Sequence, residues 1–549
     1  MVDSSALQAS PGWPIPPRFS DAGRSVPGRR NANTKPKGLN MDASKLVAAP
    51  LAALSLAVSA SAQSVYELNS DVGNSTTIDL TSMNGYYADR MYGPSSAGVT
   101  FGGMFKYDSS VSVGNPFQLI GRGHSISINN LPSEAKNNAN PASFMRVPLK
   151  FFNAEGVNAT SWLYVNKGYV SCDSLDIGRG AAVRIAYNAG WGGGNGATAI
   201  KTLFLHDGGQ LTTEDNVYMA LGANVSPFSG SVIDRAALTG VQGLRLGYQS
   251  DPLDFPLSMF LGVTNATVSA GGTNLDNGRA FTMLFQAENA SDTAEVVLGS
   301  NGWLRANCIQ HFGAGSSRIC FDGGSYVPYT SGESASLPLF YVRGRGRTSN
   351  AIFEPKMTVA GINGNPIDVS NAVDRALCGG STGNREINIT GDGGFTKRGA
   401  GTLRFNRLTQ HSACDYTGPT AILGGGVLVT DSEFKPGRGL LTVAEGAFLD
   451  LNGFDAEFSD ASGSGLVSNR AETVSTLTLG LGDDDGTLSV EIGERVNIVK
   501  TGTGTLTVSG AALAASCDLT VEAGKVVFSD DSTSWGTILV KSGATFDSS

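Results

Sequence analysis

From Val65 onward, apolar residues occur in short runs of four to seven positions, separated by Gly, Asn, Asp and Ser. Examples of these runs are Ser161–Val165, Thr202–His206, Ala294–Leu298 and Gly439–Val443. Such runs of β-branched and large apolar side chains favour strands, and Gly and Asn between them permit corners with positive φ. Helical periodicity is nearly absent. The pattern therefore predicts an all-β chain of short strands joined by tight turns.

A long internal repeat organises the C-terminal part of the chain. Lys397-Arg-Gly-Ala-Gly-Thr-Leu-Arg-Phe405 recurs 103 residues later as Lys500-Thr-Gly-Thr-Gly-Thr-Leu-Thr-Val508. Residues 441–450 correspond in the same way to 538–547, after small deletions between the matched strands. Stacked coils absorb such deletions in their outer loops. We therefore predict a right-handed parallel β-helix, a β-solenoid, with a less regular β-rich N-terminal part.

The predicted domain boundaries follow from this pattern and from the N-terminal composition. Residues 41–62 combine a charged start, an apolar run of thirteen residues and Ala60-Ser61-Ala62, the pattern of a secretory signal peptide. Residues 1–40 are interpreted as a disordered leader or a mis-called start. Residues 63–295 are predicted to form a β-rich solenoid-like region. Residues 296–549 are predicted to form a β-solenoid with the super-repeats 397–450 and 500–547.

Composition and charge narrow the classes of partner. Hydrophobic residues make up 41% of the 549 positions, so a core can form although Gly reaches 72 residues. The net charge is −9, and because residues 1–62 carry +4, the remainder carries −13. An acidic body without long basic clusters argues against nucleic acid and against an anionic membrane surface as partners. The apolar run of 46–58 is too short to span a bilayer, so no transmembrane segment is expected in the mature chain.

The C-terminal motifs resemble a known repeat family. Gly394-Phe-Thr-Lys-Arg-Gly-Ala-Gly-Thr-Leu403, Tyr416-Thr-Gly-Pro-Thr420 and Gly425-Gly-Val-Leu-Val429 are similar, in this order, to the autotransporter-associated β-strand repeat. The resemblance is clear over about 390–549 and weaker elsewhere. It implies a parallel β-helix displayed outside the cell as an adhesin-like passenger, with no catalytic residues.

The same resemblance bears on how the chain is held at the cell. Autotransporters end in a membrane β-barrel, whereas this sequence ends at Ser549 within a repeat motif. We therefore expect a fragment, a truncated product or a secreted member that uses another anchor. The expected location is extracellular or at the cell surface, and associated with the outer membrane if an anchor exists.

The sequence assigns no catalytic, cofactor-binding or metal-binding residue. The six Cys and four His show neither Cys-x-x-Cys nor His-x₃-His spacing, which gives a zinc site little support. Asp483-Asp484-Asp485 is interpreted first as a solvated turn, with weak calcium binding as the alternative. Cys308 and Cys320 are interpreted as separate buried thiols or as a local disulfide, and Cys414 and Cys517 as too far apart to bridge.

Two further groups of side chains have alternative interpretations. Arg343, Arg345 and Arg347 would share one strand face, either as a solvated edge or as a grip for an acidic polysaccharide. Core packing or coil capping is the default for large aromatic residues, and stacking on sugars is the alternative. The aromatic residues considered for that role are Trp162, Tyr164, Tyr169, Trp191 and Trp303.

The favoured hypothesis is a non-enzymatic, structural or adhesin-like surface protein that presents an elongated solenoid face. Its expected partner is a polysaccharide or a host or matrix surface. One alternative is a β-helical carbohydrate-active enzyme, a polysaccharide lyase or glycosidase, which needs two carboxylates close together in a groove. The other is a structural component of an envelope layer without a specific ligand.

Overall fold

The computed structural model describes part of the unit Leu56–Ser549. The described residues are 65–67, 86–89, 104–107, 117–128, 149–165, 171–185, 197–213, 218–221, 228–240, 243–247, 258–270, 282–287, 289–328, 338–343, 356–380, 387–407, 412–509, 516–529 and 536–548. They contain strands and turns and no helix, which confirms the all-β class. The predicted leader and signal peptide, 1–62, lie outside the described residues.

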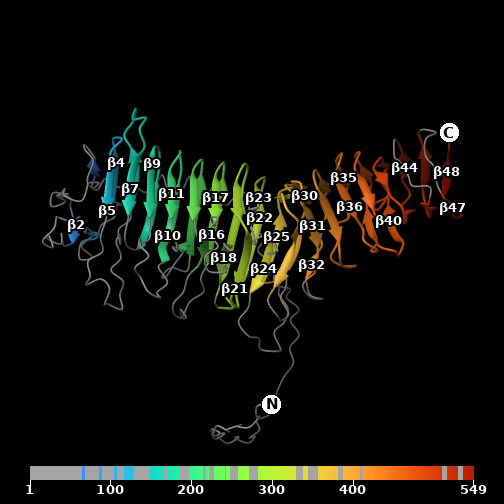
Figure 1. The fold of residues 1–549 in the computed structure, drawn as a ribbon, viewed down its shortest axis with the longest axis horizontal. Helices are drawn as coiled ribbons and strands as arrows, with labels where there is room; N and C mark the ends of the chain where they lie inside the picture. Colours follow the sequence, from blue (N-terminus) through green and yellow to red (C-terminus); the bar gives the residue numbers. More distant parts are fainter. Residues whose placement is uncertain are drawn as a thin grey trace, which may run out of the picture. The chain divides into compact units, whose positions relative to one another are not determined.

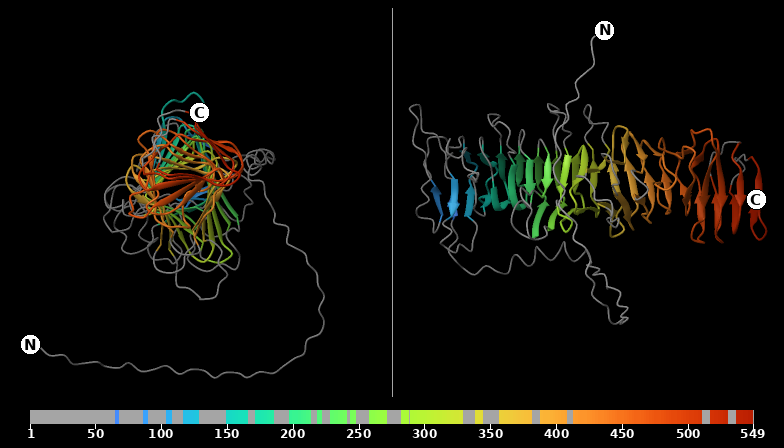
Figure 2. Two further views of the ribbon diagram at one scale, coloured as in Figure 1. Left: turned by 90° about the vertical axis from the view of Figure 1, so that its right-hand side faces the viewer. Right: turned by 90° about the horizontal axis from the view of Figure 1, so that it is seen from below.

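Successive strands pair in parallel with strands of the next coil, so the chain climbs rung by rung as a parallel β-helix (Figures 1 and 2). The first face of the coils is one ladder of an 18-stranded sheet. Its strands are β1 (Val65–Glu67), β4 (Phe117–Gly121), β6 (Leu149–Asn153), β8 (Ser171–Ile177), β10 (Ala197–Leu205), β13 (Phe228–Asp234), β16 (Ser258–Thr264), β19 (Thr293–Leu298), β22 (Ser316–Phe321), β25 (Met357–Gly361), β29 (Ile387–Gly391) and β32 (Ala413–Cys414).

The second face continues to the last described coil through one uninterrupted series of parallel pairs. Its strands are β5 (Ser125–Ile128), β7 (Ser161–Val165), β9 (Ala181–Ile185), β11 (Gln210–Thr213), β14 (Ala237–Gly240), β17 (Thr267–Ala270), β20 (Trp303–Ala306), β23 (Ser325–Val327), β26 (Ile367–Ser370), β30 (Phe395–Arg398), β33 (Thr420–Ile422), β35 (Leu441–Val443), β38 (Ala461–Ser462), β41 (Gly486–Leu488), β44 (Thr505–Val508), β46 (Lys525–Phe528) and β48 (Thr545–Asp547).

The third face begins where the first half of β10 pairs with β12. Its strands are β12 (Tyr218–Leu221), β15 (Leu244–Leu246), β18 (Thr282–Gln286), β21 (Cys308–Phe312), β24 (Phe340–Arg343) and β28 (Cys378–Gly380). Two smaller parallel sheets complete the C-terminal coils. They are β27 (Arg375–Ala376), β31 (Thr402–Phe405), β34 (Gly426–Val429), β36 (Phe448–Asp450), β39 (Leu466–Ser468) and β42 (Glu491–Ile492), and β37 (Ala456–Phe458), β40 (Ser475–Leu479), β43 (Val496–Lys500), β45 (Leu519–Val521) and β47 (Ile538–Val540).

The N-terminal part departs from this regular stacking. Between β1 and β4 the chain forms β2 (Tyr86–Asp89) and β3 (Met104–Tyr107), which pair antiparallel with each other. β1 itself pairs in parallel with β4. The two described strands between β1 and β4 therefore form a separate two-stranded sheet.

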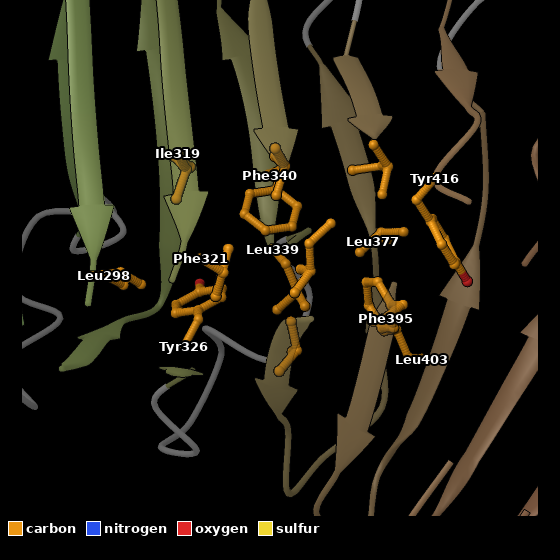
Figure 3. Packing of buried hydrophobic residues seen from close by; sticks show 14 of the residues in the cluster. Leu298, Ile319, Phe321, Tyr326, Leu339, Phe340, Leu377, Phe395, Leu403 and Tyr416 are labelled. Atoms are coloured by element: carbon orange, nitrogen blue, oxygen red, sulfur yellow. The ribbon is translucent and has the colours of Figure 1, made fainter. Parts of the chain in front are cut away.

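The core is a set of aliphatic and aromatic columns that run through the coils. Alternation along each strand sends every second side chain inward. On the second face, parallel pairing aligns Leu211 of β11 with Leu238, Leu238 with Val268, and Val268 with Leu304, and each of these is at most 1% exposed. In Figure 3, labelled side chains from successive coils, among them Phe321, Phe340 and Phe395, pack into the same interior. Each coil thus covers the apolar side chains of its neighbours.

A buried lysine explains the repeated Lys-x-Gly-x-Gly motif. The Lys397 ammonium donates to the carbonyls of Arg398, Gly399 and, in the next coil, Gly424, at 2.8, 2.9 and 3.0 Å. Its side chain is fully buried. Three carbonyls that turn inward at a corner between two faces are satisfied by a single side chain. Gly399 has a φ of 80°, a conformation that favours glycine at this corner.

The second copy of the motif repeats this arrangement on a different pair of faces. The Lys500 ammonium donates to the carbonyls of Thr501, Gly502 and, in the next coil, Ala523. Lys397 is the penultimate residue of β30 on the second face, whereas Lys500 is the last residue of β43 in the five-stranded sheet. The repeated motif therefore specifies a corner between two strands and not a fixed face of the coil.

Candidate binding groove

Short turns of two or four residues, 206–209, 235–236, 265–266 and 299–302, join the first face to the second in four consecutive coils. Each turn has one residue other than glycine with a positive φ: Asp207 (51°), Arg235 (50°), Asn265 (49°) and Asn301 (52°). The turns stack on one another, since the Gly208 N–H donates to the Arg235 carbonyl at 2.7 Å. Asn301 Nδ2 likewise donates to Asn265 Oδ1 at 3.1 Å. The turns therefore form a continuous edge along the second face.

The outward side chains of the second face form a column next to this edge. Gln210 pairs with Ala237, Ala237 with Thr267, and Thr267 with Trp303. Neighbouring strands lie about 4.8 Å apart, so the three steps of the column span about 14 Å. Trp303 is 46% exposed. The column thus has a small-residue floor, an amide at one end and an exposed indole at the other.

The edge and the column line a shallow groove of about 630 Å³ that is open to solvent. Ala237 and Thr267 form part of its floor, and Arg235, Asn265 and Asn301 contribute from the turns. The groove is the candidate binding site of the described residues because it combines an exposed aromatic ring with convergent polar groups.

Arg235 is the unusual member of the stacked turns. Arginine gains no local hydrogen bond that offsets the left-handed conformation, whereas Asn and Asp do so with their short side chains. Its guanidinium contacts Asp207 at 2.6 Å and Asp234 at 3.2 Å, and the side chain remains 60% exposed. Strained residues of this kind cluster at functional sites. Arg235 therefore places its guanidinium at the groove although its left-handed backbone conformation is unfavourable for arginine.

We expect Arg235→Asn to raise the free energy of unfolding by about 0.5 kcal/mol, because relief of the strained φ outweighs the exposed ion pairs. The reverse change at the equivalent turn, Asn265→Arg, is the matched control and should lower it by about 1 kcal/mol. Chemical denaturation of both variants measures the difference. A loss of stability in Arg235→Asn would contradict the argument from strain.

The turn that carries Asp207 also holds a histidine between two carboxylates. His206 Nε2 contacts Asp176 Oδ1 and Nδ1 contacts Asp207 Oδ2, each at 2.9 Å. The hydrogen bond to Asp176 outweighs the effect of burial and, with Asp207, raises the pKa of His206 to about 9. At neutral pH the ring is an imidazolium with both nitrogens engaged. It therefore has no free nitrogen to act as a general base.

A second histidine has the opposite electrostatic environment. His311 of β21 is buried, its Nδ1 lies 3.1 Å from Ser317 Oγ, and its Nε2 lies 3.4 Å from the Gly313 carbonyl oxygen. Burial lowers the pKa of His311 to about 4. The ring is therefore neutral at physiological pH.

The two histidines should limit stability at opposite ends of the pH scale. The unfolded pKa is about 6.5, so the contribution of His206 is complete below pH 6.5 and is lost as pH rises towards 9. As pH decreases, His311 takes up a proton at a higher pH in the unfolded chain than in the folded chain. The free energy of unfolding therefore falls between pH 6.5 and 4. His206→Gln should flatten only the alkaline slope of the unfolding free energy, and His311→Gln only the acidic slope. An unchanged alkaline slope in His206→Gln would refute the assignment.

The other aromatic residues considered from the sequence are only partly described. Trp162 and Tyr164 lie on β7, where their rings stack at 5.3 Å with an interplanar angle of 8°. Trp162 pairs with Ala182, which pairs with Gln210, so it belongs to the same outward column as Trp303. Tyr169 and Trp191 lie outside the described residues.

The acidic cluster does not line the groove, and the basic cluster is described only at Arg343. Asp483–Asp485 form an exposed turn between β40 and β41, where Asp483 and Asp485 accept hydrogen bonds from the backbone N–H groups of Thr503 and Thr505. The solvated-turn interpretation agrees with this position. Arg343 ends β24, and Arg345 and Arg347 lie outside the described residues.

Among the described residues, no group of three or more His, Cys, Asp or Glu side chains is placed to hold a metal ion. Cys308 and Cys320 are free thiols, so the alternative of a local disulfide between them is wrong. Cys308 belongs to β21 on the third face and Cys320 to β22 on the first. Burial raises the pKa of both thiols to about 12, which makes them poor nucleophiles.

Sequence reasoning missed the turn residues that complete the groove. The available signal was the spacing of Asn and Asp at positions that require positive φ, such as Asn265 and Asn301. The register that brings Gln210 into the column of Trp303 depends on the lengths of three intervening coils, which differ from one another.

Comparison with known proteins identifies one informative relative. The chain is 30% identical, over 243 residues, to the "Adhesin BmaC autotransporter" of Brucella suis biovar 1 (strain 1330). This chain is similar to an autotransporter adhesin. The matched region is 43% of this chain and spans only 6% of that relative.

The other comparisons add no family or fold. No family model matches the chain, so the autotransporter-associated repeat at 394–429 stays a resemblance. No solved structure matches it. Within the described residues there is no helix of the length and hydrophobicity that a membrane span requires.

Proposed function

We propose that this chain is an adhesin-like passenger exposed at the cell surface, whose parallel β-helix presents its outer faces to a polysaccharide, host or matrix surface. The observation that carries the proposal is the similarity to an autotransporter adhesin, in a chain whose described residues stack as parallel coils. A stack of coils offers a long row of outward side chains, which suits contact with an extended partner.

The chemistry of the described side chains favours adhesion over catalysis. A glycosidase or lyase needs a carboxylate with its acceptor atoms directed at a substrate. Here Asp483 and Asp485 hydrogen-bond the next coil, and Asp176 and Asp207 are engaged by His206. These four carboxylates stabilise turns of the coils, which supports a binding role for this part of the surface.

Surface exposure and adhesion test the proposal together. An antibody against 412–509 should label intact cells that make the protein, without permeabilisation. Loss of the gene should reduce attachment to a matrix-coated or polysaccharide-coated surface several-fold, and the intact gene should restore it. Labelling only after permeabilisation, or unchanged attachment, would contradict the adhesin role. Unchanged attachment with positive labelling would favour a structural layer component.

A further inference from the structure

The groove between Gln210 and Trp303 has the chemistry of a carbohydrate site. An exposed indole provides a flat apolar surface, and amide side chains offer both donors and acceptors. Asn265, Asn301 and Gln210 supply such amides, and Thr267 supplies a hydroxyl. Sugars combine apolar C–H ring faces with hydroxyl rims, so both parts of a sugar find a partner here.

The charge balance of the groove selects against an anionic ligand. Arg235 is the basic side chain of the lining, and its guanidinium is already paired with Asp207 and Asp234. A carboxylate or sulfate would have to compete with both carboxylates and approach a chain with a net charge of −9. A neutral ligand incurs no such repulsion, and its hydroxyls can still accept hydrogen bonds from the guanidinium.

The length of the groove indicates a chain of sugars. The amide of Gln210 and the indole of Trp303 are separated by three rungs, about 14 Å. A linear oligosaccharide that lies parallel to the solenoid axis would cross these successive rungs and stack one of its rings on the indole of Trp303.

We propose that this groove binds a neutral oligosaccharide, with Trp303 as the stacking platform and Arg235, Asn265 and Asn301 as hydrogen-bonding partners from the turns. The inference rests on the proposed surface role and names the ligand class that this face recognises. The ion pairs of Arg235 with Asp207 and Asp234 hold its guanidinium at the turn that lines the groove.

Binding of defined sugars to the full chain tests the site. The probes are soluble hexasaccharides of glucose, xylose, mannose and N-acetylglucosamine, with oligogalacturonate as the anionic probe. We expect at least one neutral probe to bind and to change the tryptophan fluorescence. Trp303→Ala should remove that change and weaken binding at least tenfold.

Two further variants separate recognition from folding. Arg235→Asn should weaken binding several-fold although it stabilises the fold, a combination that partial unfolding cannot produce. Leu423→Ala is the control, because Leu423 is 40% exposed and lies outside the groove lining. It should bind as the unchanged chain does.

Three outcomes would overturn the inference: no neutral probe binds at millimolar concentration, only oligogalacturonate binds, or Trp303→Ala binds neutral probes normally. Two further outcomes distinguish a failure of the proposed surface role from a failure of the groove. If cells carrying Trp303→Ala still attach normally, the adhesin role stands and the groove is not its site. If the purified chain binds a neutral probe while intact cells are not labelled by antibody, the groove stands and the surface role fails.

Discussion

Lys397→Met is expected to lower the free energy of unfolding by about 2–4 kcal/mol, because it removes three hydrogen bonds from a charged donor and leaves buried carbonyls unsatisfied. Methionine retains most of the side-chain volume, so the change tests the ammonium and not the packing. Burial lowers the pKa of Lys397 to about 8, which still leaves the group charged at pH 7. Chemical denaturation at pH 7 measures the loss.

The adjacent basic residue provides a matched control for this substitution. Arg398 is half exposed and pairs with Asp368 at 3.1 Å. Exposed ion pairs contribute at most about 1 kcal/mol, so Arg398→Met should have a small effect. Lys500→Met should resemble Lys397→Met, because both ammonium groups donate to three carbonyls of the same type. Equal effects of Lys397→Met and Arg398→Met would refute a structural role for the buried ammonium.

Much of the fold could be predicted from the sequence because coil stacking leaves a local signature. The run Ser161–Val165 is β7, and Ala294–Leu298 forms most of β19. These runs alternate inward and outward side chains, and glycine or asparagine marks the corner between faces. Strand identity and corner chemistry depend on neighbouring residues, so they can be read from a short window.

The groove could not be predicted in the same way, because it depends on register between coils. The sequence suggests sugar stacking for Trp303 only through its residue type. Its column partner Thr267 is 36 residues earlier, whereas Ala237 and Thr267 are 30 residues apart. Coil length varies through the outer loops, so no fixed period aligns these positions. Only the paired strands show that Gln210, Thr267 and Trp303 share one outer face.

The architecture explains why strands and corners can be predicted from neighbouring residues whereas the groove cannot. In a solenoid each coil contacts only its neighbours, so stability is close to a sum of coil and interface terms. That stacking makes most inward positions apolar and requires hydrogen-bond partners for buried polar side chains such as Lys397, whereas outward positions carry no such constraint. Recognition is therefore expected in outward columns such as that of Trp303, while repeated motifs such as those of Lys397 and Lys500 specify structure.

A close approach of two neighbouring coils at Gly393 leads to the second large expected effect. A Cβ atom at Gly393 would overlap the carbonyl group of Asn365 in the preceding coil. That obstacle is backbone between β25 and β26, so no side-chain rotation relieves it. Gly393→Ala must separate the two coils, and we expect it to cost more than about 3 kcal/mol of unfolding free energy.

Gly446→Ala is the control for this substitution, because a Cβ at Gly446 meets no atom and only its φ of 75° is unfavourable. That strain costs about 1–2 kcal/mol. In Gly393→Ala, faster amide hydrogen exchange should be confined to the strands on both sides of the contact, β26 and β30, since coils couple only to their neighbours. Stability equal to that of Gly446→Ala, or accelerated exchange spread evenly over the described coils, would show that the contact at Asn365 does not limit how closely the coils stack.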